Sequence, residues 1–334
     1  MDFLSAEQFP WLDAARERIH HSATLGRLPH SLLMLSVPGL GVEALARWTS
    51  AYALCESAGK RPCGTCPSCR LLHADSHPDA LFVRIEEDAQ QIKIDQVRAL
   101  IEALTLKSYR GGYKVGVIEG AEALNANGAN AFLKTLEEPT QNTMLILTAR
   151  PTHRLPATIA SRCLRLTLRV PPPEAARAWL AEQPRAAAGA GTPPPVAAVL
   201  GLAGGAPLLA AEIMAEGLAE ALDADMRRSL QELAAREVDI TWLAEQWMKS
   251  HTPLRIAWLE NWITTRVRTG LGAAETLQTA EPVRLPAALL KHKIRKLFEW
   301  LDATRQFRRL AATGMNQQLA LEALLLGGQT ALSE

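Results

Sequence analysis

SVPGLGVE, at residues 36–43, decides the fold of this chain. The octapeptide follows an apolar run at 32–35, which predicts a buried strand, and precedes residues 44–48, whose pattern predicts a helix. A strand, a glycine-rich turn and a helix in this order form the frame of a phosphate-binding loop. Such a loop reads G-x-x-x-x-G-K-[ST], and its backbone amides and lysine hold phosphate groups.

The octapeptide keeps the turn of such a loop but lacks its charge. Gly39 and Gly41 allow the tight turn that starts at Ser36, whereas Val42 replaces the lysine and Glu43 replaces the hydroxyl. A carboxylate at a helix N-terminus satisfies the helix dipole and repels an incoming anion. We interpret the segment as a degenerate nucleotide loop. On these eight residues alone, an ordinary glycine-rich strand-to-helix turn is an equal alternative.

Length and composition limit the class of protein. A chain of 334 residues with 48% hydrophobic content is long enough for two or three domains with real cores. The formal net charge of +1 gives no global attraction for nucleic acid, so any such contact has to be local. The N-terminal residues do not resemble a signal peptide, and no apolar run approaches the roughly 18–20 residues that span a bilayer. We expect a cytoplasmic protein.

Two patterns divide the chain. Up to about residue 168, short apolar runs alternate with helical patterns, as is typical of a parallel α/β sheet, and from about 208 onward the pattern is almost wholly helical. Prolines at 171–173 mark the boundary, and the Ala/Gly/Pro-rich stretch 185–195 is interpreted as a linker or loop. The predicted strands are 32–35, 80–85, 115–118, 144–148 and 163–168. The main helices predicted between them are 94–104 and 125–138.

Four cysteines are spaced C-x₇-C-x₂-C-x₂-C: Cys55, Cys63, Cys66 and Cys69. Four thiolates at this spacing predict a closed tetrahedral zinc site, which stabilises a fold and has no open position for catalysis. Either His73 or His77 could take the place of Cys55 as a ligand. Redox chemistry is the alternative, although it uses one C-x-x-C pair at a helix start. Cys163 lies apart and is interpreted as a small buried residue.

A second predicted strand, 115–118, ends in acidic residues. In an ATPase, one carboxylate at such a strand end binds Mg²⁺, and another activates water. Glu119 can take the first role, but Gly120 stands where the second carboxylate would be. The chain therefore lacks two separate catalytic groups. Taken alone, a strand that ends in a solvated acidic turn is the simpler interpretation.

A longer segment carries a family resemblance. NANGANAFLKTLEEP, at residues 125–139, is similar to the A-x-N-A-L-L-K-T-L-E-E-P segment of clamp-loader subunits, and Ser161-Arg162-Cys163 is similar to their SRC motif. The order of loop, cysteine insertion, acidic strand end and these two segments resembles the AAA+ clamp loaders of bacterial DNA polymerase III along nearly the whole chain. Residues 316–326 are similar to a last collar helix of that family.

The resemblance implies an α/β plus all-α fold with three domains. Residues 1–169 would form an AAA+ P-loop-type parallel sheet domain with a Cys₄ zinc module at about 55–75. Residues 170–210 would form a small helical lid domain, and 211–334 a helical collar that builds the oligomer.

The family's site residues are carried over one position at a time. Arg162 matches the arginine finger that the family inserts into the ATP site of a neighbouring motor subunit, although on residues alone it would be taken as a surface arginine. Thr148 matches the sensor position at the end of the fourth strand, and Leu208 stands where a motor subunit has a sensor arginine. The four cysteines match the family's zinc ligands, with a slightly different first gap.

These features together imply a stator subunit that does not itself hydrolyse ATP. It would support ATP-dependent loading of the sliding clamp onto primed DNA as part of the DNA polymerase III holoenzyme, and it would hold one structural zinc. The implied partners are the gamma/tau motor subunits, the delta subunit, primer-template DNA and, indirectly, the clamp, but no membrane.

The first alternative is an autonomous AAA+ ATPase, a motor subunit or a repair enzyme, with a divergent loop. The second is a Cys₄ module that reads DNA, for which the basic residues near the cysteines are sparse: Lys60, Arg61 and Arg70.

The helical C-terminal part carries clustered charges and tryptophans. The segment 291–309 is rich in Lys and Arg but has an apolar stripe, so we interpret its charges as solvated or paired with partner subunits, with DNA backbone as the alternative. Four tryptophans at helical spacings predict core or subunit-interface positions: Trp242, Trp247, Trp258 and Trp262.

Overall fold

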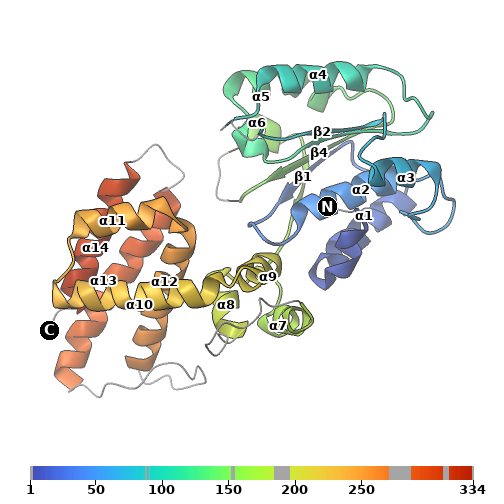
Figure 1. The fold of residues 1–334 in the computed structure, drawn as a ribbon. Coiled ribbons are helices and arrows are strands. Elements are labelled where there is room, and N and C mark those ends of the chain that lie inside the picture. Colours follow the sequence, from blue (N-terminus) through green and yellow to red (C-terminus); the bar gives the residue numbers. More distant parts are fainter. Residues whose placement is uncertain are drawn as a thin grey trace. The chain divides into compact units, whose positions relative to one another are not determined.

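The computed structural model describes residues 3–86, 89, 91–151, 155–183, 196–270, 287–310 and 316–332. The chain divides into two compact units, Met1–Pro171 and Pro172–Glu334 (Figure 1). The predicted linker at 185–195 lies outside the described residues. The predicted domain bounds 1–169, 170–210 and 211–334 remain a prediction.

The first unit is built on a parallel sheet with the strand order β2-β3-β4-β1-β5. All five predicted strands are present, with shifts of a residue or two at their ends: β1 (Ser31–Leu35), β2 (Ala80–Val83), β3 (Lys114–Ile118), β4 (Thr143–Ala149) and β5 (Leu164–Thr167). Strands β3 and β4 are buried along their whole length. Their nearly continuous apolar sequences fit a parallel sheet that is covered on both faces.

Helices cover both faces of this sheet. Figure 1 shows α4 (Ile94–Thr105) and α5 (Ala126–Glu137) on one face and α2 (Val42–Leu54) on the other. Gly116 in β3 lets α4 approach closely, because a Cβ there would lie 3.1 Å from the side chains of Leu100 and Leu104. The shorter elements of this unit are η1 (Phe3–Gln8), η2 (Pro10–Leu12), α1 (Asp13–Thr24), α3 (Pro67–His73), η3 (Ala121–Ala123) and α6 (Ala157–Ala160).

The described part of the second unit is helical, as the sequence predicts. Its elements are α7 (Pro173–Ala181), α8 (Val196–Leu202), α9 (Pro207–Ala215), α10 (Leu218–Ala235), α11 (Ile240–Lys249), α12 (Thr252–Gly270), α13 (Ala287–Leu310) and α14 (Gln317–Leu332). Among the described residues no single helix is long and apolar enough to cross a membrane. The joined pair α8 and α9 meets that criterion by length and composition, but it is bent by 113°.

Tryptophans organise the core of the second unit. Trp247 and Trp258 are buried, and the rings of Trp258 and Trp262 stack with their centroids 6.3 Å apart. Trp300, which is also buried, meets Trp262 edge-on and packs on Gly328 of α14, where a Cβ would come within 2.4 Å of the indole. Trp242 differs from the others, because half of it is exposed.

Candidate functional site

The degenerate loop lies at the carboxyl edge of the sheet, directly after β1. Gly39 and Gly41 have φ angles of 80° and 79°, a left-handed conformation that glycine adopts without strain. Ser36 is buried, and its hydroxyl donates to the Val37 carbonyl at 2.8 Å. The segment therefore has the strand–turn–helix geometry that the sequence predicts.

Apolar side chains fill this loop. Leu40 is fully buried and its carbonyl accepts a hydrogen bond of 2.9 Å from the Trp11 indole. Val42, at the position of the lysine, is also buried, while Glu43 is exposed in the first turn of α2. Residues 36–43 contain no cationic side chain that could bind a phosphate.

The acidic strand end and the sensor position meet beside this loop. The backbone amide of Gly120 donates to the hydroxyl of the buried Thr148 at 3.0 Å. Burial raises the pKa of Glu119 above its ordinary value, and the nearby Glu43 carboxylate raises it further, against the opposing effect of the Arg47 guanidinium. The predicted residues Glu119, Gly120 and Thr148 thus belong to one edge of the sheet.

Arg47 is a residue of this edge that sequence reasoning did not identify. Its guanidinium forms a 2.5 Å ion pair with Asp75 and lies 4.8 Å from the ring centroid of Phe82. Its position four residues after Glu43 on α2 was the available signal, because side chains with this spacing share one helix face. The Arg47 guanidinium is thus already paired with groups of its own chain.

Arg162 lies at the opposite, amino edge of the sheet. It precedes β5, and its carbonyl accepts a 2.7 Å hydrogen bond from the hydroxyl of Ser31, the first residue of β1. Ser36, the first residue of the loop, lies five residues after Ser31, just beyond the carboxyl end of β1. At about 3.3 Å per residue, this separates Arg162 from the chain's own loop by about 16 Å. The next residue, Cys163, is half-buried, and burial raises its pKa to about 11.

The Arg162 side chain is held by neighbouring acceptors. Its Nε donates to a carboxylate oxygen of Glu137 at 2.7 Å, and its Nη2 forms an ion pair with the same oxygen. Its Nη1 donates to the Thr158 carbonyl at 2.9 Å. The guanidinium side chain remains 34% exposed.

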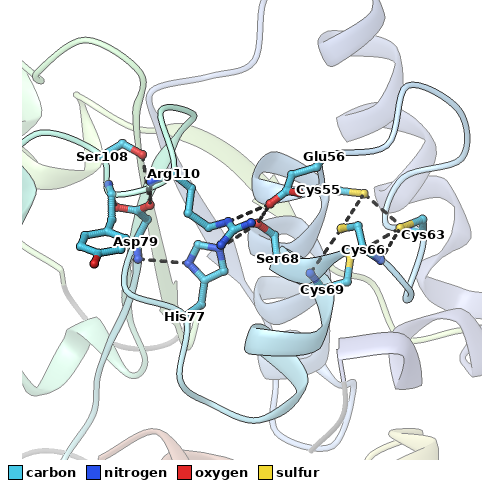
Figure 2. Close-up of polar contacts among 11 residues, drawn as sticks. Cys55, Glu56, Cys63, Cys66, Ser68, Cys69, His77, Asp79, Ser108 and Arg110 are labelled. Carbon is cyan, nitrogen blue, oxygen red and sulfur yellow. Dashed lines mark hydrogen bonds and ion pairs between the residues drawn. The ribbon is translucent and has the colours of Figure 1, made fainter.

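The four predicted cysteines come together at the amino edge (Figure 2), with their sulfur atoms all within 4.8 Å of one another: Cys55, Cys63, Cys66 and Cys69. They form no disulfide. The sulfurs of the first and third cysteines are 4.0 Å apart, as are those of the second and fourth. Neither His73 nor His77 belongs to this group.

Backbone amides point at the sulfurs. The amide of Cys66 donates to the sulfur of Cys63 at 3.3 Å, and the amide of Cys69 donates to that of Cys66 at 3.4 Å. Backbone hydrogen bonds from Thr65 and Cys66 lower the pKa of Cys63 to about 6, whereas burial raises the pKa of Cys55 and Cys69. Such N–H donors favour thiolate, which is the form that binds metal.

A polar network joins the cysteine group to the sheet. His77 is buried, its Nδ1 accepts from the Asp79 amide at 3.0 Å, and its Nε2 lies 3.1 Å from the Ser68 hydroxyl. Because Nδ1 is an acceptor, Nε2 carries the proton and donates to Ser68. Ser68 in turn donates to Glu56 at 2.7 Å, and Arg110 donates to the same carboxylate oxygen at 2.8 Å (Figure 2).

Asp79 completes this network. It is almost fully buried, and it accepts hydrogen bonds of 2.8–3.1 Å from the Ser108 hydroxyl and from the amides of Tyr109 and Arg110. Burial lowers the pKa of His77 and thereby favours the neutral imidazole that this geometry requires. Sequence reasoning considered His77 only as a possible metal ligand, whereas the structure uses it to support the residues around the ligands.

Two further predicted regions lie in the second unit. Leu208 is half-buried in the first turn of α9. In α13, Arg305 and Arg308 form ion pairs of 3.1 and 2.8 Å with Glu260 of α12, and Arg295 pairs with Glu299 at 3.0 Å. These arginines are paired inside the unit. The side chains of residues 291–293 lie outside the described part.

Known proteins resemble both units. Residues 12–172 match the family described as "DNA polymerase III, delta subunit", and residues 224–330 match "DNA polymerase III, delta subunit, C terminal". The chain is 33% identical over 333 residues to DNA polymerase III subunit delta' of Pseudomonas aeruginosa, which covers 96% of this chain and 97% of that protein. The chain belongs to the DNA polymerase III delta' subunit family.

Other relatives agree with this assignment. The delta' subunit of Escherichia coli strain K12 is 32% identical over 327 residues, which cover 95% of this chain and 94% of that protein. The tau subunit of the same strain is 32% identical over 147 residues, which cover 44% of this chain and 22% of tau. The predicted resemblance to clamp-loader subunits is confirmed, and so is the fold class of a parallel AAA+ sheet unit with a helical C-terminal part.

Proposed function

We propose that this delta' family member is the clamp-loader subunit that does not hydrolyse ATP and that supplies Arg162 to the ATP site of a neighbouring motor subunit. One observation carries the proposal. The loop edge of the sheet lacks the lysine and hydroxyl that hold a triphosphate and the carboxylate that activates water, while the opposite edge presents an arginine that cannot reach that loop.

The chemistry of each edge supports this division of labour. The loop has a buried valine in place of the lysine and an exposed glutamate in place of the hydroxyl, so it repels phosphate. At the neighbouring strand end, Gly120 stands in place of the catalytic carboxylate and cannot activate water. Arg162 offers a planar, permanently charged fork that suits phosphate oxygens. At a separation of about 16 Å from its own loop, it would act only in trans.

The proposed partners follow from the family. They are the gamma/tau motor subunits, the delta subunit and primer-template DNA in the assembled complex, with the sliding clamp as the object that is loaded. The similarity of this chain to a 147-residue part of a tau subunit supports neighbours of related architecture. The AAA+ sheet, lid and collar would have the predicted bounds, and the protein would work in the cytoplasm at the replication machinery.

We also propose that the cysteine group holds one structural zinc ion. Tetrahedral ligation with Zn–S distances of about 2.3 Å places sulfurs about 3.8 Å apart, close to the 4.0 Å separations found here. Four sulfur ligands leave no open position for water, so the ion would stabilise the segment between α2 and β2 and take no part in hydrolysis.

Arg162→Ala tests the trans role in the reconstituted complex. An arginine finger contributes on the order of 10³–10⁵ in rate at its site, so DNA-stimulated ATPase activity should fall by the contribution of one site, with clamp loading slowed. Assembly and the melting temperature of the subunit should be unchanged. Arg165→Ala, at a neighbouring exposed arginine, is the matched control. ATPase and clamp-loading rates equal to those of the unaltered complex would refute the role.

A further inference from the structure

Each nitrogen of the Arg162 guanidinium already has an acceptor in its own chain. Glu137 takes Nε and Nη2, while the Thr158 carbonyl takes Nη1 at 2.9 Å, with the Ser161 hydroxyl 3.4 Å from the same nitrogen. A fork meets a phosphate through two parallel N–H groups. The parallel N–H groups of Nε and Nη2 both meet Glu137, so a phosphate can use this edge of the fork only if Arg162 gives up that carboxylate.

The backbone and the side chain are held by different elements. The Arg162 carbonyl is fixed by the Ser31 hydroxyl at the start of β1. The side chain is held by Glu137, the last residue of α5, and by the carbonyl of Thr158 in α6. The guanidinium can therefore leave its acceptors while the backbone keeps its place against the sheet.

We propose that Glu137 is the resting partner of Arg162, and that the guanidinium exchanges this carboxylate for a phosphate when the neighbouring subunit binds ATP. The proposal rests on the proposed trans role of Arg162. Glu137 is a positioning residue in this account, because it acts only through the arginine. While the pair is closed, it presents little net charge to an approaching nucleotide.

Exposure makes the exchange easy. The side chains of Arg162 and Glu137 are 34% and 48% exposed, and an ion pair between such groups changes an equilibrium constant by at most about five-fold. A triphosphate carries several negative charges and accepts bidentate, charge-assisted hydrogen bonds, which are the stronger kind. The nucleotide therefore outcompetes a single exposed carboxylate, and the carboxylate weakens its binding slightly.

Glu137→Gln in the reconstituted complex tests this exchange. Without the competing charge, the apparent KM of DNA-stimulated ATPase for ATP should fall by about two- to five-fold, with kcat unchanged. Binding of a non-hydrolysable ATP analogue should tighten by the same factor, and Glu137→Asp should return both values toward those of the unaltered complex. Glu138→Gln, the adjacent exposed glutamate, is the control and should change neither.

The outcomes separate this inference from the proposed function. Adding Glu137→Gln to Arg162→Ala should have no further effect on KM, because the competed group is gone. A lower kcat in Glu137→Gln would show that the carboxylate aligns Arg162 for catalysis, and an unchanged KM would show that it does not compete; either result overturns the exchange. If Arg162→Ala itself leaves ATPase activity unchanged, the trans role fails as well.

Discussion

The carboxyl and amino edges of the parallel sheet differ in the functional side chains that they carry. At the carboxyl edge, the loop at 36–43 keeps its glycines but has Val42 and Glu43 in place of the lysine and the hydroxyl, and the acidic strand end has Gly120 in place of a second carboxylate. At the amino edge, four sulfurs converge with backbone donors aimed at them, and Arg162 is fixed to the first residue of β1. Both edges belong to the same sheet, but the loop at the carboxyl edge departs from the phosphate-binding pattern, whereas the four sulfurs at the amino edge lie close enough to hold a metal ion.

Under the proposed function, this difference would let an ATPase-like frame serve a neighbouring subunit. A five-residue strand such as β1 places its two ends about 16 Å apart, so the groups at one edge can change independently of those at the other. Leu40 and Val42 are buried in this loop, and α2 begins directly after it, at Val42. The amino edge is reinforced by a polar network that reaches from Glu56 to Asp79.

The largest expected effect comes from removing one sulfur of the four-cysteine group at the amino edge. Cys69→Ser removes a fully buried sulfur, so zinc should be lost and the stability of the subunit should fall by about 3 kcal/mol or more. Metal content by mass spectrometry and thermal unfolding measure both effects. Cys163→Ser, outside the group, should keep about one zinc per chain. An unaltered protein that is folded and contains no zinc would contradict the metal assignment.

A smaller effect is expected from restoring the phosphate-binding side chains of the loop at the carboxyl edge. Val42→Lys combined with Glu43→Thr restores the cation and the hydroxyl of a working loop. A charged hydrogen bond contributes about 1.5–3 kcal/mol, so affinity for an ATP analogue should rise about ten-fold or more, as measured by titration of the isolated chain. Hydrolysis should remain absent because Gly120 is unchanged.

Val42→Met combined with Glu43→Thr is the control for that experiment, because it adds length without charge. A gain in affinity equal to that of the lysine variant would show that the missing cation is not what prevents binding.

The smallest effect concerns Glu119. Burial raises its folded pKa, so its contribution to stability is present below the ordinary glutamate pKa of about 4.3 and is lost as pH rises through the folded value. Glu119→Gln should therefore raise the melting temperature at pH 7 by about 1–2 °C, with the gain disappearing near pH 4. Melting curves across this range measure it, with Glu138→Gln as an exposed control. If the gain in melting temperature persists at pH 4, it arises from packing and not from the ionisation of Glu119.

Much of the fold could be predicted from sequence because the relevant signals are local. The apolar runs of β1, β3 and β4 and the cysteine spacing each reflect interactions within a few residues, and the structure contains the strands and brings the sulfurs together. The pairing of Arg162 with Glu137 was not predictable in this way, since it joins residues 25 positions apart across α5 and α6. The sequence offered His77 as a possible metal ligand, but only the fold shows that it is turned toward Ser68 and Asp79.

ATP turnover by the purified chain, free of other subunits, tests the central claim most directly. With Mg²⁺ and primed DNA present, phosphate release should stay at background, because the loop holds no cation and Gly120 cannot activate water. Sustained turnover that survives further purification would contradict the account and would identify the chain as an ATPase in its own right.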